Sequence, residues 1–266
     1  ADILLNSVFD PDELERERGV ILQELGQVED TPDDVIFDRF QSAAFPGQSL
    51  GRPVLGTADI IKSLPRQAVI DFQRRHYGAS TMVVSAAGRL DHDQLVAMVD
   101  KAFGALPAEA DAQHDVARYA GGAMRDDSEL EQVHFVLGYP GVSFSDPDYY
   151  AVSTLSTLLG GGMSSRLFQE IREKRGLCYT ISSFAASYLD GGLFGVYTGT
   201  GESEIAELIP VLAEELAKVG VTPPEDEVRR ARAQMKAGLL MSLESTNARS
   251  DALASQLLIF GRPITP

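Results

Sequence analysis

The chain has 266 residues, 44% of them hydrophobic and 23% charged, and its 39 acidic against 23 basic side chains give a formal net charge of −16. The composition is ordinary for a protein with a hydrophobic core, and the negative charge argues against nucleic acid or an anionic membrane as a partner, because both present phosphates. No apolar run approaches the roughly 18 residues of a membrane helix, so no membrane insertion is expected, and a single cysteine, Cys178, excludes an internal disulfide and a cysteine-based zinc site.

Helices dominate the first part of the chain. Asp10 is expected to cap a helix that continues to about Asp30, because Pro11 suits a first helical turn and Glu13 completes a pattern similar to a capping box. The run STMVVSAAG predicts a strand. Three further helices are expected over DDVIFDRFQSAAF, RQAVIDFQRRHY and HDQLVAMVDKAF, and Asp91 and Gln94 can cap the last of them. These elements belong to a first domain, which we assign to residues 1–107.

A shift in composition marks the end of this domain. Residues 108–127 are rich in Ala, Gly and Asp without periodicity, which is typical of a linker. The second domain, residues 128–266, begins with the alternating strand EQVHFVLGYPG and a helix over DPDYYAVSTLSTLL. A glycine loop, Gly160–Gly162, then leads into a charged helix that Gly176 closes.

The rest of the second domain contains a hairpin and long helices. CYTISSFAASY and GLFGVYTGT predict two strands, and the residues LDGG between them are a good hairpin signal. Two long helices follow, over SEIAELIPVLAEELAKVG and PEDEVRRARAQMKAGLLMSLES, and an apolar helix ends shortly before Pro266. Both halves mix strands and helices without strict βαβ alternation, so we predict an α+β fold rather than a doubly wound α/β fold.

Two carboxylates lie at the edge of the apolar face of the first long helix. Glu17 and Glu24 are seven residues apart, which places them about 20° from each other around the helix axis. The apolar stripe beside them contains Leu14, Ile21 and Leu25. A buried carboxylate needs a metal, a cation or a hydrogen bond, and zinc accepts carboxylate oxygen as a ligand. A solvated helix edge explains the spacing equally well, because acidic proteins often show such pairs.

The segment ERERGVILQE resembles the E-x-x-V-I-L-x-E segment of the pitrilysin/insulinase-type zinc peptidases, in particular the β subunit of the mitochondrial processing peptidase and its bacterial homologues. The likeness continues through DVIFDRFQSAAFPGQSLGRPVLGT and GGGMSSRLFQEIREKRGLCYTISSF and covers nearly the whole chain. The resemblance implies that Glu24 is a zinc ligand and that Glu17 supports the site without binding the metal. It also implies two related domains, each a mostly antiparallel sheet backed by helices.

The second domain carries a further group of candidate residues. Arg172 offers five fixed donors and Tyr179 a phenolic hydroxyl, both suited to a peptide carbonyl or a developing oxyanion. The resemblance implies that this pair binds substrate and that Gly160, Gly161 and Gly162 form a flexible loop near the substrate cavity. A solvated helix arginine, an ordinary strand tyrosine and helix-cap chemistry at the loop are the alternatives. A nucleotide loop is not expected, because no Lys-Ser/Thr follows the glycines.

The family's H-x-x-E-H motif, which supplies two histidine ligands and a general base, is not present in this chain. None of the four histidines has that spacing: they are His76, His92, His114 and His134. The resemblance places the motif upstream of Ala1, so we expect the chain to be a fragment in which both domains are truncated. Because catalytic zinc takes three protein ligands, the chain alone is expected to be inactive.

The resemblance implies a zinc-dependent endopeptidase that hydrolyses short or unfolded peptides, and the charge of −16 would favour basic ones. Zinc is the implied cofactor, a peptide the implied substrate, and the intact protein is expected to form a homo- or heterodimer. The alternative is a non-catalytic core or scaffold subunit, or an inactive partner, of the same family. The bacterial cytoplasm is the expected compartment, with the periplasm and the mitochondrial matrix as alternatives.

Overall fold

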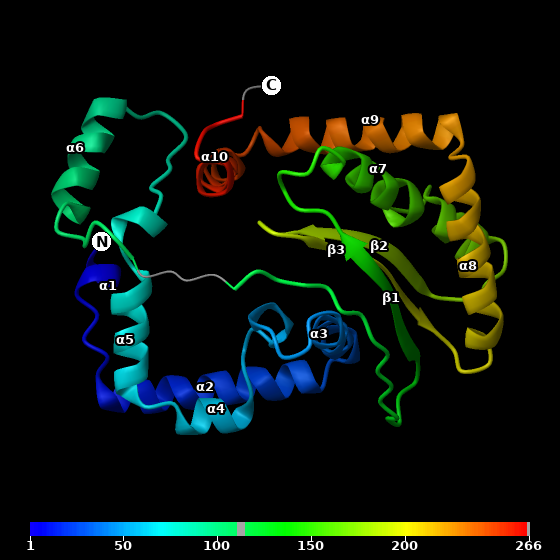
Figure 1. Ribbon diagram of the computed structural model, residues 1–266, viewed down its shortest axis with the longest axis horizontal. Coiled ribbons are helices and arrows are strands. Elements are labelled where there is room, and N and C mark those ends of the chain that lie inside the picture. The colour runs from blue at the N-terminus through cyan, green and yellow to red at the C-terminus, as the bar shows by residue number, and fades with distance from the viewer. Residues whose placement is uncertain (111–114, 265–266) are drawn as a thin grey trace. The chain divides into compact units, whose positions relative to one another are not determined.

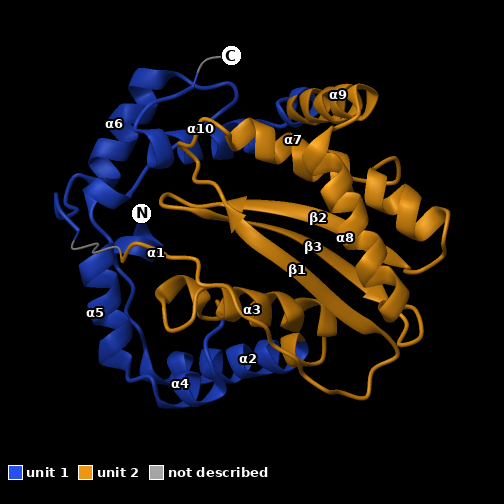
Figure 2. Ribbon diagram, turned by 45° about the vertical axis from the view of Figure 1, so that its right-hand side comes forward, with its two compact units in different colours: residues 1–27, 55–114, 240–266 blue, residues 28–54, 115–239 orange. Residues whose placement is uncertain are grey.

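The computed structural model describes residues 1–110 and 115–264 and contains the mixture of helices and antiparallel sheet predicted for an α+β protein (Figure 1). The chain forms two units, each assembled from segments that are distant in the sequence (Figure 2). Unit 1 comprises residues 1–27, 55–114 and 240–266, and unit 2 comprises residues 28–54 and 115–239. Part of the predicted linker, with His114, lies outside the described residues, and the assignment of domains remains a prediction.

Unit 1 is built from helices, and the predicted caps are present. Asp10 Oδ1 accepts hydrogen bonds from the backbone of Asp12 (2.9 Å) and Glu13 (3.2 Å), and Asp91 Oδ1 accepts one from the backbone of Gln94 (2.9 Å). These bonds satisfy donors that a helix start leaves without an intrahelical partner. The helices are α1 (Asp2–Leu5), α2 (Pro11–Glu29, which ends in unit 2), α4 (Ala58–Ser63), α5 (Arg66–His76), α6 (His92–Phe103) and α10 (Thr246–Phe260). In the described part of the chain, no helix is long and apolar enough to cross a membrane.

The strand predicted over STMVVSAAG is wrong. The segment begins with the 3₁₀ turn η2 (Ala79–Thr81) and continues in extended backbone, with Met82 at φ −123° and ψ 139°. The ladders of the described residues pair only β1, β2 and β3, so this segment has no strand beside it. A strand is defined by its neighbour, because its backbone N–H and C=O groups bond across the ladder. The segment is bound instead through side chains, with Ser85 Oγ donating to the Ser250 carbonyl on α10 at 2.8 Å.

Unit 2 is organised around a three-stranded antiparallel sheet with the order β1-β3-β2. Helix α3 contacts β1 on one face of the sheet, and α7 packs on β2 from the other face (Figure 1). The predicted hairpin is confirmed, with Tyr188 N donating to Gly191 O at 2.8 Å. The strands are β1 (Val133–Gly141), β2 (Thr180–Ser187) and β3 (Gly192–Thr200). The helices are α3 (Pro32–Ala44), α7 (Tyr149–Gly160), α8 (Ile205–Val221) and α9 (Glu225–Ser242), and η1 (Ser49–Gly51) is a 3₁₀ turn.

The two faces of the sheet are filled differently. On the α7 side, a core forms around β3, with fully buried members that include Leu159, Ile171, Val196, Leu208 and Leu212. On the α3 side, Phe40 and Phe184 meet edge to face with ring centroids 5.8 Å apart. Glycines make room for these rings, because a Cβ at Gly138 would collide with Phe40 and one at Gly195 would collide with Phe184. Close packing of this kind leaves no space for an added methyl group.

The charged helix predicted after the glycine loop has an unusual form. It is a wide π-helical segment, η3 (Phe168–Glu173), and Gly176 ends it with φ +66°, as predicted. Wide turns of this type are rare and occur often at functional sites. Ser165 at the start of this helical segment does not cap it, because its buried hydroxyl has no hydrogen-bond partner among the described residues.

Candidate functional site

The two predicted glutamates of α2 are both exposed, but their surroundings differ. Glu17 lines a pocket of about 320 Å³ that Glu24 does not line. The other lining residues are Phe9, Leu14, Arg18, Ile21, Ile61, Leu64 and Val69. Leu14 and Ile21 of the apolar stripe expected beside the carboxylates therefore line this pocket, whereas Leu25 does not, and Glu17 is one of the two charged residues of the lining.

Arg18 positions the helix that carries both glutamates, a role that the sequence pattern did not indicate. Its side chain is only 16% exposed. Its guanidinium donates to the carbonyls of Ile61 and Leu64 at the end of α4, the second bond measuring 3.0 Å from Nη2. Hydrogen bonds to charged groups are roughly twice as strong as neutral ones, so Arg18 ties α2 to α4. The sequence signal available for this role was the position of Arg18 next to the apolar stripe of α2.

The described residues do not form a complete metal site by themselves. No group of three or more His, Cys, Asp or Glu side chains that would suit a metal ion is found in residues 1–110 and 115–264. Catalytic zinc takes three protein ligands, and carboxylate oxygen is one of the accepted types. This part of the chain therefore supplies no full set of ligands, and the role of Glu24 as one ligand of a zinc ion stays a prediction.

In unit 2, the predicted substrate residues Arg172 and Tyr179 lie together. The guanidinium carbon of Arg172 is 4.5 Å from the centroid of the Phe168 ring and 5.2 Å from that of Tyr179. Both distances are within the range of cation–π attraction. Arg172 has no carboxylate partner within 4.0 Å among the described residues, and the nearby Glu170 is bound by Lys174 and Arg175 instead. The donors of Arg172 are thus available to a ligand.

The backbone around Tyr179 is fixed by the neighbouring strand β3. Tyr179 N donates to Gly199 O at 3.2 Å, and Thr198 Oγ1 donates to the carbonyl of Thr180 at 2.9 Å. Thr200 Oγ1 donates to the carbonyl of Leu177 at 2.5 Å. Tyr179 is nevertheless 71% exposed, so its side chain is accessible to a ligand while the backbone around it is held by β3. A pre-positioned donor of this kind suits ligand binding, because little ordering is left to be done.

Each glycine of the predicted loop has a local structural reason. A Cβ at Gly160 would collide with the backbone of Ser183 on β2, and one at Gly161 would lie 2.6 Å from the Thr157 carbonyl. Gly162 has φ +147°, which L-residues rarely adopt. Gln234 on α9 donates from Nε2 to the Gly161 carbonyl at 2.7 Å. The loop is thus held against β2, α7 and α9, and its contact with substrate remains a prediction.

A buried ion network fixes the segment that follows the loop. Arg166 donates to both carboxylate oxygens of Glu227, at 2.8 and 2.9 Å, and to Glu215 at 2.9 Å. Lys218 donates to Glu215 at 2.7 Å. Burial alone would raise the pKa of Glu215, but the hydrogen bonds from Lys218 and Arg166 outweigh it and hold this pKa below its ordinary value. The network joins the start of the π-helical segment to α8 and α9.

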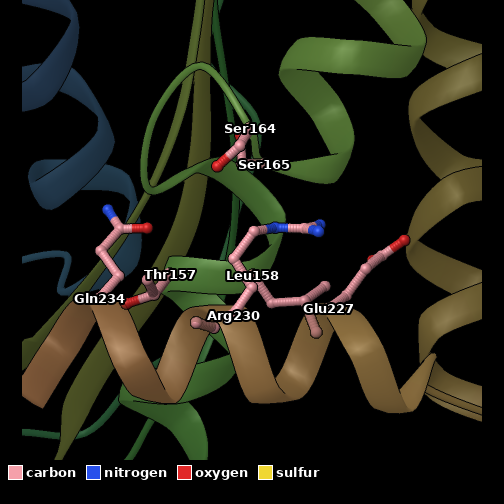
Figure 3. A pocket seen from close by; sticks show the side chains of 8 residues that line it. Thr157, Leu158, Ser164, Ser165, Glu227, Arg230 and Gln234 are labelled. Atoms are coloured by element: carbon pink, nitrogen blue, oxygen red, sulfur yellow. The ribbon is translucent and has the colours of Figure 1, made fainter.

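A small cavity lies between the loop and α9. Figure 3 shows Glu227, Arg230 and Gln234 projecting from α9 toward Ser164 and Ser165. Its volume of about 10 Å³ is close to that of a single water molecule, which excludes a peptide side chain. The cavity therefore belongs to the anchorage of the loop and is not a substrate pocket.

The candidate residues fall into two groups. Glu17 and Glu24 belong to unit 1, whereas Arg172, Tyr179 and Gly160–Gly162 belong to unit 2. Within unit 2, the structure brings Arg172 and Tyr179 together on one side of η3. Within unit 1, it places the two glutamates on one helix, with Glu17 in the lining of the apolar pocket.

Two family models match the chain. "Insulinase (Peptidase family M16)" matches residues 1–58, and "Peptidase M16 inactive domain" matches residues 63–235. An uncharacterized zinc protease of Rickettsia bellii is 35% identical over 267 residues, which cover 100% of this chain and 65% of the relative. The β subunit of the mitochondrial-processing peptidase of Lentinula edodes is 32% identical over 284 residues, which cover 100% of this chain and 61% of that subunit. The chain therefore spans less than two thirds of the length of these relatives.

Solved structures share the fold. A peptidase M16 inactive domain from Pseudomonas fluorescens aligns with a TM-score of 0.84 and 21% identity, covering 98% of this chain and 63% of that one. A chain of complex III from Candida albicans aligns with a TM-score of 0.81 and 22% identity, covering 94% of this chain and 62% of that one. At these identities the likeness extends to the fold alone.

Proposed function

Since the chain belongs to the M16 (insulinase) family of peptidases, we propose that the protein containing it is a zinc-dependent endopeptidase acting on short or unfolded peptides. The observation that carries this proposal is the Arg172–Tyr179 pair, a guanidinium without a carboxylate partner among the described residues beside an exposed phenol. Such donors match the carbonyl oxygens of a peptide backbone. The names of the relatives as zinc proteases support the same class of reaction.

The residues have separate roles in this proposal. Glu24 would hold a zinc ion through its carboxylate, and Glu17 would orient the site without binding the metal. Arg172 and Tyr179 donate hydrogen bonds to the peptide, and the loop Gly160–Gly162 lies beside it. A bound zinc ion supplies Lewis acidity and lowers the pKa of coordinated water. The net charge of −16 favours basic peptides by long-range attraction.

A non-catalytic subunit is the second candidate. Residues 63–235 match a family model described as an inactive domain, and a complex III chain shares the fold. In that case the protein would serve as a core subunit or as the inactive partner of an active one. Both candidates imply association with a second subunit, of the same or a different kind.

The zinc content of the full-length protein, purified without added metal, separates the two candidates. The peptidase requires about one tightly bound zinc per chain, and Glu24→Gln should abolish its retention. Glu17→Gln should retain the metal with affinity lowered roughly 10- to 100-fold. Glu29→Gln, an exposed position on the same helix, is the matched control and should leave zinc unchanged. Absence of zinc in the unaltered protein, even after reconstitution, would establish the non-catalytic subunit.

A further inference from the structure

We propose that Phe168 is a positioning residue that holds the Arg172 guanidinium in the direction from which it donates to the peptide. The inference rests on the proposed function for the role of Arg172, and it adds a residue that no resemblance or motif indicated. The Phe168 ring faces the guanidinium at 4.5 Å, nearer than the ring of Tyr179 at 5.2 Å. The Arg172 guanidinium is therefore within cation–π distance of two aromatic rings.

The Phe168 ring is itself fixed. Phe168 is half-buried and packs against the main core cluster of unit 2, whose fully buried members include Leu167 and Ile171 on either side of it. Tyr179 differs, because its side chain is 71% exposed. The ring that can hold Arg172 in one direction is therefore Phe168, and Tyr179 remains free to contact a ligand.

No carboxylate lies within 4.0 Å of the Arg172 guanidinium among the described residues. Two acidic residues belong to η3: Glu170 is bound by Lys174 at 2.5 Å and Arg175 at 3.3 Å, and Glu173 forms no ion pair with Arg172. A carboxylate partner would occupy two of the five guanidinium donors, whereas an aromatic face occupies none of them. Stacking on Phe168 thus orients the group and leaves its donors for peptide carbonyls.

The π-helical form of the segment supports this arrangement. η3 begins at Phe168 and includes Arg172, so the wide turn is the backbone between the two stacked side chains. Gly176 N donates to the Arg172 carbonyl at 3.0 Å and Leu177 N to the Ile171 carbonyl at 3.1 Å, which closes the segment directly after Arg172. Both ends of the stacked pair are therefore fixed by the backbone.

The test compares Phe168→Leu, Phe168→Tyr and Arg172→Ala in the full-length protein. Phe168→Leu should raise KM for a peptide substrate and lower kcat/KM about 3- to 30-fold, the range that loss of a cation–π contact gives, with kcat retained. Phe168→Tyr, which keeps the ring, should restore KM. A purely structural role would instead reduce the active fraction, and therefore kcat, with KM unchanged.

A double-mutant cycle gives the decisive comparison. If Phe168 acts through Arg172, Phe168→Leu should have no further effect on KM when Arg172 is already alanine. Two outcomes would overturn the inference. The first is that Phe168→Leu raises KM by the same factor with arginine and with alanine at position 172. The second is that Phe168→Leu leaves KM unchanged although Arg172→Ala raises it. If Arg172→Ala itself leaves KM unchanged, it is the proposed role of Arg172 in substrate binding that fails.

A measurement without turnover completes the design. In protein labelled at arginine, the Arg172 Nε–H resonance should carry an upfield ring-current shift that Phe168→Leu reduces and Phe168→Tyr keeps, since the Tyr179 ring remains in both variants. This readout holds whether or not the protein is a peptidase. A resonance unchanged by Phe168→Leu would refute the stacking itself.

Discussion

Replacing Glu215 by glutamine tests the ion network that fixes the segment behind the glycine loop. Glu215 has a side chain only 3% exposed and receives hydrogen bonds from Arg166 at 2.9 Å and Lys218 at 2.7 Å. The substitution removes the charge while keeping the volume of the side chain. The neighbouring Glu214 is the matched control, because it also binds Lys218, at 2.9 Å, but is 61% exposed.

The expected loss follows from burial. Breaking a buried ion pair costs about 3–5 kcal/mol, and a hydrogen bond to a charged group contributes about 1.5–3 kcal/mol. Arg166 keeps its two bonds to Glu227 in the variant, so the lower part of this range applies. We expect the free energy of unfolding to fall by about 2–3 kcal/mol for Glu215→Gln. For Glu214→Gln, an exposed pair, the change should stay within about 0.5 kcal/mol.

Urea unfolding followed by circular dichroism measures both variants. With an m-value of about 3 kcal/mol/M, the midpoint should fall by about 0.7–1 M for Glu215→Gln and by less than about 0.2 M for the control. Equal midpoints for the two variants would refute the idea that burial gives Glu215 its importance. A changed m-value would indicate instead that the substitution altered the denatured state or the cooperativity.

The contribution of Glu215 to the free energy of unfolding should decrease as the pH is lowered. The pKa of Glu215 is lowered in the folded protein, because the bonds from Lys218 and Arg166 outweigh burial. A carboxyl group of this kind stabilises the fold above its unfolded pKa, about 4.3, and loses that contribution as the pH falls through the folded pKa. The difference in midpoint between the unaltered protein and Glu215→Gln should therefore be full at pH 7 and shrink below about pH 4.3. A difference that grows on acidification would contradict this assignment.

Two further predictions concern single residues in close packing. Gly160→Ala should lower the free energy of unfolding by at least about 2 kcal/mol, because the added Cβ would collide with the Ser183 backbone. The control Gly19→Ala, which adds a Cβ in open space within α2, should raise the free energy of unfolding by about 0.5–1 kcal/mol. The urea midpoints of the two variants measure both effects. The Cys178 thiol is 8% exposed and burial raises its pKa, so it should react with a disulfide reagent at pH 8 at least about tenfold more slowly than free cysteine and at full rate in urea. Rapid reaction in the native state would show that Cys178 is accessible.

The features that the sequence predicted well depend on short stretches of chain. The caps by Asp10 and Asp91, the left-handed Gly176 and the hairpin before Gly192 each involve residues within about one helical turn or one β-turn. Their geometry is largely decided by the local side chains, so a sequence pattern is sufficient.

The features that it missed depend on partners far away in the chain. Arg18 bonds to Ile61, 43 residues later, and Arg166 bonds to Glu227, 61 residues later. No periodicity within either segment indicates these partners, so both arginines looked like ordinary helix residues. The strand over residues 80–88 failed for the same reason, because an alternating segment becomes a strand only beside another strand. One missed feature is local: the Phe168–Arg172 contact joins residues four apart, and it was missed because it lies in a π-helical turn that helix propensities do not predict.

The three glycines of the loop differ in how far packing alone explains them. Gly160 and Gly161 are explained by close backbone approach, so their presence would be required whether or not a peptide binds. Gly162 is different, because a Cβ added there would meet open space except for Gln234 at 3.8 Å, and the next residue, Met163, is 75% exposed. If the loop contacts a peptide, this geometry leaves the contact to Gly162 and Met163. The predicted contact of the loop with substrate therefore has to be tested at Gly162 and Met163, because packing already explains Gly160 and Gly161.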